Sequence, residues 1–424
     1  MKKKNQRHIL RKLKSNCHLL LSYILITFIY LILSTSIYPQ QKTFITVKGR
    51  EIIDTNGKNL LLKGINLGNW LVPEGYMFHF KKTNSPRLIY DLFNVLLGEE
   101  EANKFWDSYR ENYITKDDIH FIKSLGFNSV RIPFNFRLFV SGYPYRELKG
   151  EGYRFLDRVI KWCKEEGLYI ILDMHCAPGG QTGDNIDDSY GYPFLFESPE
   201  SQQLTIDIWR KLAEIYKDEN IIIGYDLLNE PIAHYFDAEK LNPELEPLYK
   251  RITSAIREVD TNHIVFLGGA QWDTNFKIFS PPFDNKLVYT FHKYWTDPTQ
   301  DVIQDYIDFS EKYNVPIWLG ESGENSNDWI NSFRIILEKN NIGWCFWPYK
   351  KMDSERGVVS INEPDDFDLI IDFANNGSYD YSSIRDNRPD VKKVRSALKQ
   401  YLENCILKNC IINEDYIKAL GLKQ

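Results

Sequence analysis

The feature that most constrains the fold of this chain is the regular alternation of short apolar runs with amphipathic stretches. Several runs are continuously apolar, as expected for parallel strands buried on both faces, and the stretches between them have helical periodicity. Eight such runs occur, at residues 60–67, 128–133, 168–174, 221–228, 263–268, 287–291, 316–320 and 343–347. A strand-then-helix unit repeated eight times predicts an α/β fold, the (β/α)8 TIM barrel.

The segments between and around these runs add detail to the predicted barrel. The longest insertions, residues 68–112 and 175–201, each follow a strand and belong to the carboxyl-terminal rim, where barrels carry their active sites. A doubly wound parallel sheet is the competing architecture, but neither a GxGxxG motif nor a P-loop follows the first strand. Residues 44–47 and 51–54 flank a Lys48-Gly49 turn and predict an N-terminal β-hairpin. Helical patterns are expected over residues 151–166, 201–216, 247–259, 326–340 and 390–402.

Residues 1–38 have the composition of an export segment. Residues 1–18 hold seven Lys and Arg and no acid, and residues 19–33 are apolar apart from Ser22 and Thr27. This pattern is typical of a signal peptide, and Ser34-Thr35-Ser36 offers small residues for cleavage. An uncleaved membrane anchor over residues 19–38 is the alternative, since a span needs about 20 apolar residues. We expect a secreted or extracytoplasmic protein that contacts a membrane only through this segment, with a single domain over residues 39–424.

The charge balance narrows the class of partner. The whole chain has 52 Lys and Arg and 58 Asp and Glu. Loss of residues 1–38 would remove seven basic residues and no acidic ones, so 45 basic and 58 acidic residues would remain, a net charge of about −13. Nucleic-acid binding needs clustered Lys and Arg, so nucleic acid is excluded and a neutral partner is favoured. Cys405 and Cys410 could pair in an exported protein, but the six cysteines show no metal-binding spacing.

Polar residues gather where the apolar runs end. A single strand-end Glu or His is usually structural, either a rim ion pair or a satisfied histidine. Here six ends carry such groups, and in a barrel the carboxyl ends of the strands converge over one mouth. The candidate site residues are Arg131, His175, Asn229, Glu230, His292, Tyr294, Glu321 and Trp347.

Glu230 and Glu321 follow the fourth and seventh runs, and no metal-ligand motif lies near them. Glycoside cleavage uses two such carboxyls, one protonated for the leaving oxygen and one ionised at the anomeric carbon. We expect Arg131 to lie beside one of them and to lower its pKa, and the other, among aromatic groups, to be the acid. Retention and inversion both remain open, because the sequence does not give the separation of the two carboxyls.

In these residues the chain resembles glycoside hydrolase family 5, the cellulase family A of retaining β-glycosidases on a (β/α)8 barrel. The resemblance rests on Asn229-Glu230-Pro231 after the fourth strand and on Glu321 closing the seventh, in order with Arg131, His175 and the His292-Lys293-Tyr294 motif. It covers nearly the whole chain after the leader.

The resemblance also implies a role for each site residue. Glu230 would be the acid/base and Glu321 the nucleophile. Asn229 would hydrogen-bond the sugar 2-hydroxyl, and Arg131 and Tyr294 would orient Glu321. By the same resemblance His175 and His292 line the substrate pocket, and Trp347 is the floor of the sugar subsite beside the scissile bond.

Two stretches, residues 64–71 and 175–181, are similar to the exo-β-1,3-glucanase branch of the family. An acidic insertion with Asp184, Asp187 and Asp188 follows the second stretch. Because it lacks EF-hand spacing, we expect a solvated loop rather than a Ca²⁺ site. Four aromatic residues lie just past strand ends, where they either stack on sugar rings or pack the rim of the barrel: Trp70, Trp272, Trp295 and Tyr349.

The sequence thus predicts an exported, monomeric, retaining β-glycosidase that hydrolyses a β-glucan, either β-1,3-glucan or a cellulose-like chain. Its partner would be a β-linked polysaccharide or oligosaccharide, and we expect neither a cofactor nor a metal. A metal-dependent hydrolase is disfavoured because His175 and His292 lack a visible cluster of further ligands. Two alternatives remain, a non-catalytic carbohydrate-binding or adhesion barrel and a transglycosylase with the same carboxylates. The sugar, the linkage and endo versus exo action stay open.

Overall fold

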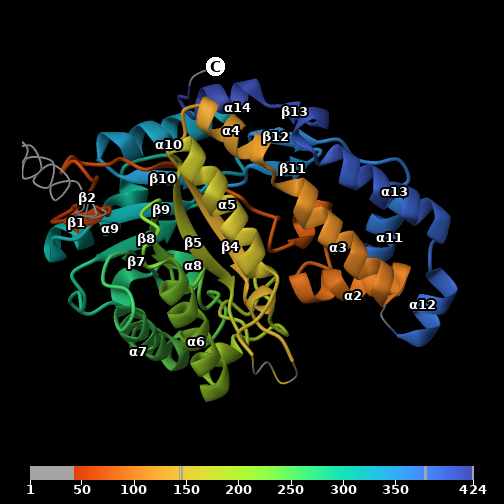
Figure 1. The fold of residues 1–424 in the computed structure, drawn as a ribbon, viewed down its shortest axis with the longest axis horizontal. Helices are drawn as coiled ribbons and strands as arrows, with labels where there is room; N and C mark the ends of the chain where they lie inside the picture. The colour runs from red at the N-terminus through yellow and green to blue at the C-terminus, as the bar shows by residue number, and fades with distance from the viewer. Residues whose placement is uncertain (1–42, 143, 145–146, 377–379, 423–424) are drawn as a thin grey trace, which may run out of the picture. The chain divides into compact units, whose positions relative to one another are not determined.

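Eight parallel strands close into a barrel in the computed structural model, which confirms the (β/α)8 fold (Figure 1). The structure describes residues 43–142, 144, 147–376 and 380–422. Neighbouring strands follow the order of the chain, and β10 pairs with β3 to close the sheet, so the doubly wound alternative is wrong. The strands are β3 (Lys63–Asn66), β4 (Ser129–Asn135), β5 (Tyr169–Cys176), β6 (Ile222–Asp226), β7 (Ile264–Gly268), β8 (Leu287–His292), β9 (Ile317–Glu321) and β10 (Gly343–Phe346).

Amphipathic helices cover the outside of the barrel, as their periodicity predicts. In α5 the buried residues recur at helical spacing, from Phe155 and Val159 to Cys163. Side-chain caps set two helix starts: Ser198 accepts from the Ser201 amide before α6, and Ser326 from the Trp329 amide before α10. The helices between strands are α4 (Lys116–Ser124), α5 (Gly152–Glu166), α6 (Pro199–Tyr216), α7 (Ala238–Arg257), α9 (Asp301–Tyr313) and α10 (Asn327–Lys339), with the single-turn α8 (Ala270–Asp273) after β7.

The predicted start of α7 is wrong. The expected helical pattern begins at Pro247. In the structure Asp237 caps the helix much earlier, accepting from the amides of Glu239 and Lys240, and both Pro243 and Pro247 lie inside it.

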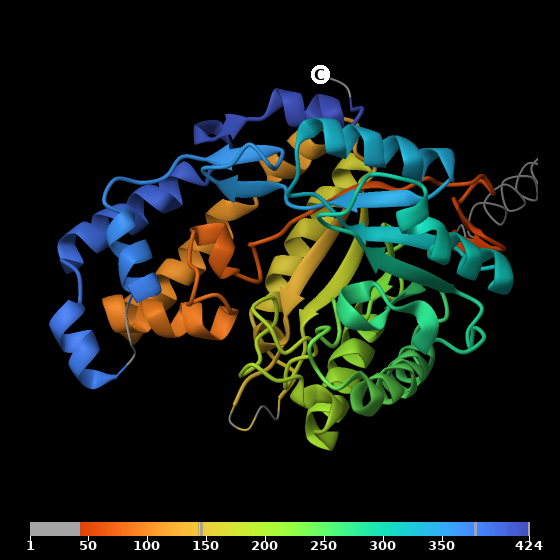
Figure 2. The same cartoon turned by 180° about the vertical axis from the view of Figure 1, so that it is seen from behind.

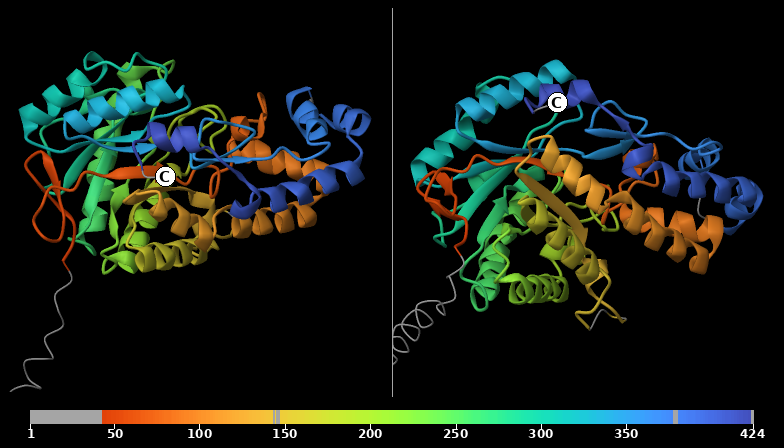
Figure 3. Two further views of the ribbon diagram at one scale, coloured as in Figure 1. Left: turned by 90° about the horizontal axis from the view of Figure 1, so that it is seen from above. Right: turned by 45° about the horizontal axis from the view of Figure 1, so that its top comes forward.

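The insertion at residues 68–112 is helical, with η1 (Gly75–Phe78), α2 (Pro86–Leu97) and α3 (Glu99–Tyr113). Helix α13 (Val391–Asn404) packs against α2 and α3, and Figures 1, 2 and 3 show these elements side by side, beside the barrel. The chain after β10 is also richer than the single helix expected there. It adds a sheet of β11 (Lys350–Met352), β12 (Val359–Ile361) and β13 (Ile411–Ile412), with η5 (Leu407–Asn409), α11 (Asp368–Asn376), α12 (Tyr381–Asn387) and α14 (Glu414–Ala419).

The barrel interior divides into an apolar half and a charged half. Successive inward residues of a strand are two positions apart, and on β5 these are Ile171, Asp173 and His175. Ile171 belongs to an apolar cluster that Ile45 and Ile52 join from the predicted hairpin, β1 (Thr46–Lys48) and β2 (Glu51–Ile53). Asp173 and His175, further along the same face, begin the charged half at the carboxyl ends of the strands.

The predicted leader lies outside the described residues. Among the residues that are described, no helix is long and apolar enough to cross a membrane. Cys405 and Cys410 are not paired: their thiols face backbone carbonyls, Leu402 O at 3.4 Å and Asn404 O at 3.1 Å respectively.

Candidate active site

The structure brings all eight candidate residues into one connected group. Arg131 contacts Glu321 and Asn229, Asn229 contacts His175, and the His175 ring stacks on Trp347 with centroids 5.5 Å apart. Tyr294 donates to Glu321 at 3.2 Å, and His292 meets Glu230 at 2.8 Å. The group lies at the carboxyl ends of the barrel strands, where the topology predicts a shared site.

Arg131 is the centre of this group and is fully buried. Its guanidinium contacts Asp226 Oδ2 at 2.8 Å, Asp173 Oδ1 at 3.1 Å and Glu321 Oε1. It also donates to Asn229 Oδ1 at 2.9 Å and to Asn66 Oδ1 at 3.1 Å. A buried guanidinium needs this many partners, because burial removes its hydrating water and only ion pairs and hydrogen bonds can replace it.

Glu321 closes β9 and is almost completely buried. Arg131 binds its Oε1, and the Tyr294 hydroxyl donates to its Oε2. Burial raises the pKa of Glu321, while His292, Arg131 and His175 act to lower it. Arg131 therefore lowers this pKa as expected, while desolvation, whose size the sequence does not give, acts in the opposite direction and is larger.

Glu230 is held by its backbone in the left-handed region, with φ of 46°. Its amide donates to Asp273 Oδ2 at 3.1 Å, and the Thr182 hydroxyl donates to its carbonyl at 2.8 Å. A non-glycine residue seldom adopts this conformation unless its surroundings impose it, and such residues cluster at functional sites. These contacts aim the Glu230 side chain at His292.

Burial raises the pKa of Glu230 to about 7, the main cause being desolvation. Burial also lowers the pKa of His292 to about 3, so this imidazole is neutral over the physiological range. A carboxyl with such a pKa keeps its proton at mildly acidic pH, which is what a general acid needs.

His175 is buried between two carboxylates. Its Nδ1 lies 2.8 Å from Asp173 Oδ2 and its Nε2 lies 3.3 Å from Glu74 Oε1. Burial alone would lower the pKa of His175, but these neighbours, Asp173 first, raise it to about 10. The ring stacks on Trp347 at an interplanar angle of 8°.

Trp347 lies against Gly68 of the first long insertion. A Cβ atom at Gly68 would come within 2.5 Å of the Trp347 ring, so only glycine permits this placement. The indole N–H of Trp347 donates to the Tyr76 hydroxyl. One insertion thus fixes the tryptophan that the family resemblance assigns to the sugar subsite.

Five further polar residues of the site were not predicted: Asn66, Glu74, Asp173, Asp226 and Asp273. Asp173 precedes His175 by two positions on one strand, so the period of a strand could have marked it. Asn66 and Asp226 end β3 and β6 and share the strand-end signal. Glu74 and Asp273 lie in segments without periodicity, and no local pattern indicated them.

The acidic insertion is not the solvated loop expected from its composition. Asp187 and Asp188 are both buried. Asp187 accepts from the amides of Thr182, Gly183 and Ser189, and Asp188 pairs with Arg137. The loop is therefore a built part of the rim, and it carries the Thr182 that holds Glu230.

Among the residues that the structure describes, two groups each hold three possible ligand atoms within 4.8 Å of one another: Asp173, His175 and Glu321, and Glu230, His292 and Glu321. The expectation that the two histidines lack ligand-type neighbours is therefore wrong. Glu321, which both groups share, is already bound by Arg131. The arrangement suits proton transfer and carboxylate attack.

The rim aromatic residues divide between packing and exposure. Trp70 and Tyr349 are buried and belong to the core. Trp295 is 75% exposed, and Trp272 is half-buried beside His234, with ring centroids 4.8 Å apart. Of these four residues, Trp272 and Trp295 are accessible to a sugar.

Together the barrel and its carboxylates define a glycoside hydrolase. Residues 81–353 match the family model described as Cellulase (glycosyl hydrolase family 5), and the chain belongs to this family. The family resemblance is thereby confirmed.

The sequences of relatives agree with this assignment, and a solved structure agrees with the fold. The "Beta-xylosidase" of Phanerodontia chrysosporium is 30% identical over 360 residues, 75% of this chain and 73% of that protein. The "Glucan 1,3-beta-glucosidase" of Candida oleophila is 30% identical over 265 residues, 57% of this chain and 60% of that protein. The endoglucanase Cel5A of Thermotoga maritima shares the fold, with a TM-score of 0.52 at 19% identity over 85% of this chain and 96% of that one.

Proposed function

We propose that this family 5 enzyme is a retaining β-glycosidase that hydrolyses a β-glucan by double displacement. The observation that carries the proposal is the spacing of the two carboxyls: an oxygen of Glu230 and an oxygen of Glu321 lie within 4.8 Å of each other. Inverting enzymes separate their carboxyls by about 6.5–9.5 Å to admit a water, whereas retaining ones use about 5–5.5 Å.

In the first step a Glu321 oxygen attacks the anomeric carbon, and the bond from that carbon to the leaving oxygen breaks. Arg131 and Tyr294 hold the two Glu321 oxygens and stabilise the ionised form. Glu230 transfers its proton to the leaving oxygen, so that an alcohol departs rather than an alkoxide.

In the second step Glu230 is a carboxylate and takes a proton from water. The water oxygen forms a bond to the anomeric carbon while the bond to Glu321 breaks, which returns both carboxyls to their starting states. The two inversions give net retention. Asn229, whose Oδ1 is held by Arg131, is the residue we assign to the sugar 2-hydroxyl.

The proposed substrate class rests on the relatives. One is named for glucan 1,3-β-glucoside cleavage, one is an endoglucanase and one is named a β-xylosidase. We therefore place β-glucan first, with β-1,3-linked and cellulose-like chains as the two forms, and a β-xyloside as an outcome to be tested. We further propose export through residues 1–38, and a monomer in solution.

A product profile tests the proposal. Purified protein from Gln40 onward is incubated with laminarin, mixed-linkage glucan, carboxymethylcellulose, aryl β-glucoside and aryl β-xyloside, beside Glu321→Gln as the blank. We expect release from at least one β-glucan, with single sugars indicating exo action and a ladder of oligosaccharides indicating endo action. Binding without release would favour the adhesion alternative, and products larger than the substrate would favour the transglycosylase. Activity in Glu321→Gln equal to that of wild type would contradict the proposal.

A further inference from the structure

A second cavity lies on the carboxyl-end rim, between the helical insertion and the barrel. Its volume is about 430 Å³, and its wall comes from α2, α3, η2 (Phe136–Phe139), the end of β4 and the residue before α5. Sites for small molecules usually measure about 300–1,000 Å³. None of the eight candidate active-site residues lines this rim cavity. The polar side chains of its wall are those of Asn135, Trp106, Arg110, Arg137, Asp107 and Glu151.

Two buried donors in the wall of the rim cavity lack an acceptor. Asn135 is 1% exposed and Trp106 is 3% exposed. The Arg137 amide donates to Asn135 Oδ1 at 3.0 Å, so the other terminal atom, Nδ2, is the amino group and a donor. Neither Asn135 Nδ2 nor Trp106 Nε1 has a hydrogen-bond partner among the residues that the structure describes. Buried polar groups are nearly always hydrogen-bonded, so two such donors in one cavity indicate a ligand that supplies acceptor atoms.

The charges of the rim cavity are balanced. Arg110 is 6% exposed and pairs with Glu151 at 2.8 Å and with Asp107 at 3.5 Å. Arg137 pairs with Asp188 of the acidic insertion. The wall therefore holds two guanidinium groups and two carboxylates, without an excess charge that would select an ion. The carboxylate oxygens of Asp107 and Glu151 can accept hydrogen bonds from hydroxyl groups, so the ligand that fits is neutral and rich in hydroxyls.

The rim cavity also lies close to the active site. Asn135 is the last residue of β4, four residues beyond Arg131 on the same strand. At a rise of about 3.3 Å per residue, about 13 Å separates the two residues along the strand. Tyr90 adds an aromatic ring to the wall, edge-on to Trp106 with ring centroids 4.9 Å apart, and such rings suit the apolar faces of sugars. A polysaccharide held at the active site therefore passes within reach of this cavity.

We infer that the rim cavity is a secondary binding site for a sugar unit of the glucan. Sugar oxygens accept hydrogen bonds from Asn135 Nδ2 and Trp106 Nε1, and sugar hydroxyls donate to Glu151 and Asp107. The choice of a sugar as the ligand rests on the proposed function. Binding one polymer at two places raises its apparent affinity without changing the chemical step. A short aryl glycoside gains nothing from this site, because it cannot occupy both places at once.

The indole N–H signals of Trp106 and Trp347 report on the two sites separately. Protein with Glu321→Gln, which prevents turnover, is labelled with ¹⁵N-tryptophan and titrated by NMR with laminarihexaose and with cellohexaose. The two signals are assigned by their loss in Trp106→Phe and Trp347→Phe. We expect the Trp106 signal to shift and to saturate with at least one of these sugars, because its N–H gains an acceptor.

Variants test whether the sugar lies in the cavity. Asn103 is an exposed residue of α3 that lines the cavity, so Asn103→Phe should fill its mouth and abolish the Trp106 shift. Asn135→Asp keeps an acceptor for the Arg137 amide but replaces the donor by a carboxylate oxygen, and sugar binding at Trp106 should weaken about tenfold or more. Ser108→Phe, at an exposed position of the same helix that does not line the cavity, is the matched control and should keep the shift.

Kinetics on active protein give a second readout. In Asn103→Phe the KM for the polymer of the sugar that binds, laminarin or carboxymethylcellulose, should rise at least about threefold relative to the KM for aryl β-glucoside. In Ser108→Phe this ratio should stay as in wild type. An unchanged ratio in Asn103→Phe would overturn the inference, because the cavity would then contribute nothing to polymer binding.

The NMR outcomes separate the inference from the proposed function. A Trp347 shift without a Trp106 shift at about 10 mM sugar would overturn the inference and leave the proposed function intact. A Trp106 shift that persists in Asn103→Phe would also overturn it, because the sugar would then act from the active site. Wild-type protein that cleaves no glucan would contradict the proposed function, whereas a Trp106 shift that Asn103→Phe abolishes would still support the rim cavity as a sugar site.

Discussion

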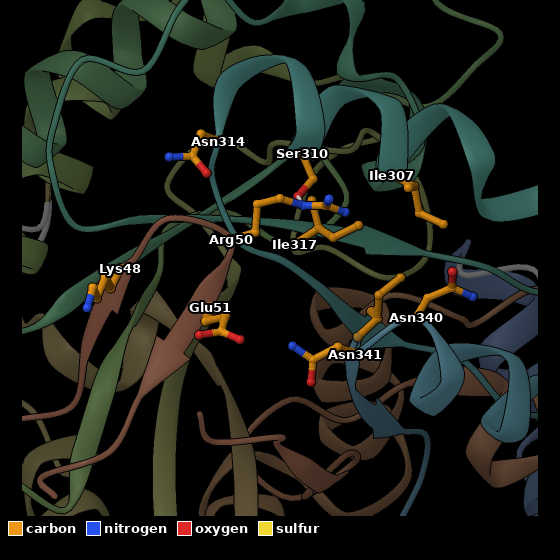
Figure 4. Close-up of a pocket in the computed structure, with 10 residues that line it drawn as sticks. Lys48, Arg50, Glu51, Ile307, Ser310, Asn314, Ile317, Asn340 and Asn341 are labelled. Atoms are coloured by element: carbon orange, nitrogen blue, oxygen red, sulfur yellow. Dashed lines mark hydrogen bonds between the residues drawn. The ribbon is translucent and has the colours of Figure 1, made fainter. Parts of the chain in front are cut away.

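The two ends of the barrel both carry arginines and acids, but the charged groups are buried at one end and solvated at the other. At the carboxyl end, Arg131 is fully buried among Asp173, Asp226 and Glu321. At the amino end, Arg50 is 40% exposed, and it pairs with Glu311 at 2.9 Å and donates to Ser310 at 3.1 Å. Figure 4 shows Arg50, Ser310 and Asn314 around the hollow at this end.

A surface hollow by itself does not indicate an active site. The hollow of Figure 4 is lined by polar groups such as Lys48, Glu51 and Asn341, which water can solvate. The carboxyl end instead removes Glu230 and Glu321 from water, and this removal raises both pKa values. Perturbed acids with specific partners are the better indicator of an active site.

The largest expected difference between the two ends is in activity. Glu230→Ala should lower kcat/KM by about 10²–10⁴ on glucans and alkyl glycosides, whose leaving groups need a proton. The loss on activated aryl glycosides should be far smaller, because their leaving groups depart as anions. Glu51→Ala, at the amino end, should leave both rates unchanged. Equal losses of the Glu230 variant on both substrate types would contradict its role as the acid.

The second difference is in stability. Arg131→Met leaves three acids buried without their cation, and we expect the free energy of unfolding to fall by about 3–5 kcal/mol. Arg50→Met removes an exposed pair and should change it by less than about 1 kcal/mol. Urea unfolding of both variants followed by fluorescence is the measurement. A destabilisation of similar size in the two would show that burial does not distinguish these arginines.

The same difference between the two ends explains which parts of the fold and the site could be predicted from the sequence. Buried parallel strands are continuous apolar runs, so all eight could be predicted, and the polar residues at six of their ends marked Arg131, His175, Glu230 and Glu321. The strand period would also have marked Asp173. The amino end offers no comparable signal, because solvated polar groups are ordinary on any surface.

Contacts made by irregular segments could not be predicted from the sequence. Glu74 reaches His175 from an insertion, and Asp273 reaches Glu230 from a left-handed turn, and neither segment has a period that fixes a side chain. The acidic loop was misjudged because composition indicates solvation, whereas Asp187 is buried and satisfied by backbone amides. The rise in the Glu321 pKa could not be predicted either, because the degree of burial is a tertiary property.

A smaller effect is expected from the hydroxyl that supports Glu321. Tyr294→Phe removes one hydrogen bond to a charged oxygen, worth about 1.5–3 kcal/mol, so kcat should fall by about tenfold or more while the fold remains intact. Phenylalanine at an exposed tyrosine, Tyr381→Phe, is the matched control. Unchanged kcat in Tyr294→Phe would show that the Tyr294 hydroxyl does not assist Glu321.

The pH dependence of the wild-type enzyme reports the protonation of Glu230. Because burial raises the pKa of Glu230 to about 7, its proton is present below that pH and is lost above it. We expect kcat/KM on a poor leaving group to fall about tenfold per unit above pH 7. Glu230→Gln assayed with an activated aryl glycoside should lack this alkaline limb. Persistence of the limb in that variant would assign it to another group.

Double displacement at Glu321 requires a covalent glycosyl-enzyme, which can be trapped. The protein is incubated with 2-deoxy-2-fluoro-β-glucosyl fluoride, which slows both steps by destabilising the oxocarbenium-like transition state while its good leaving group keeps the first accessible. Mass spectrometry of the intact chain and of its peptides should then show one fluoroglucosyl group, bound to Glu321. An adduct on another residue, or none from an enzyme that cleaves aryl β-glucoside, would contradict double displacement at Glu321.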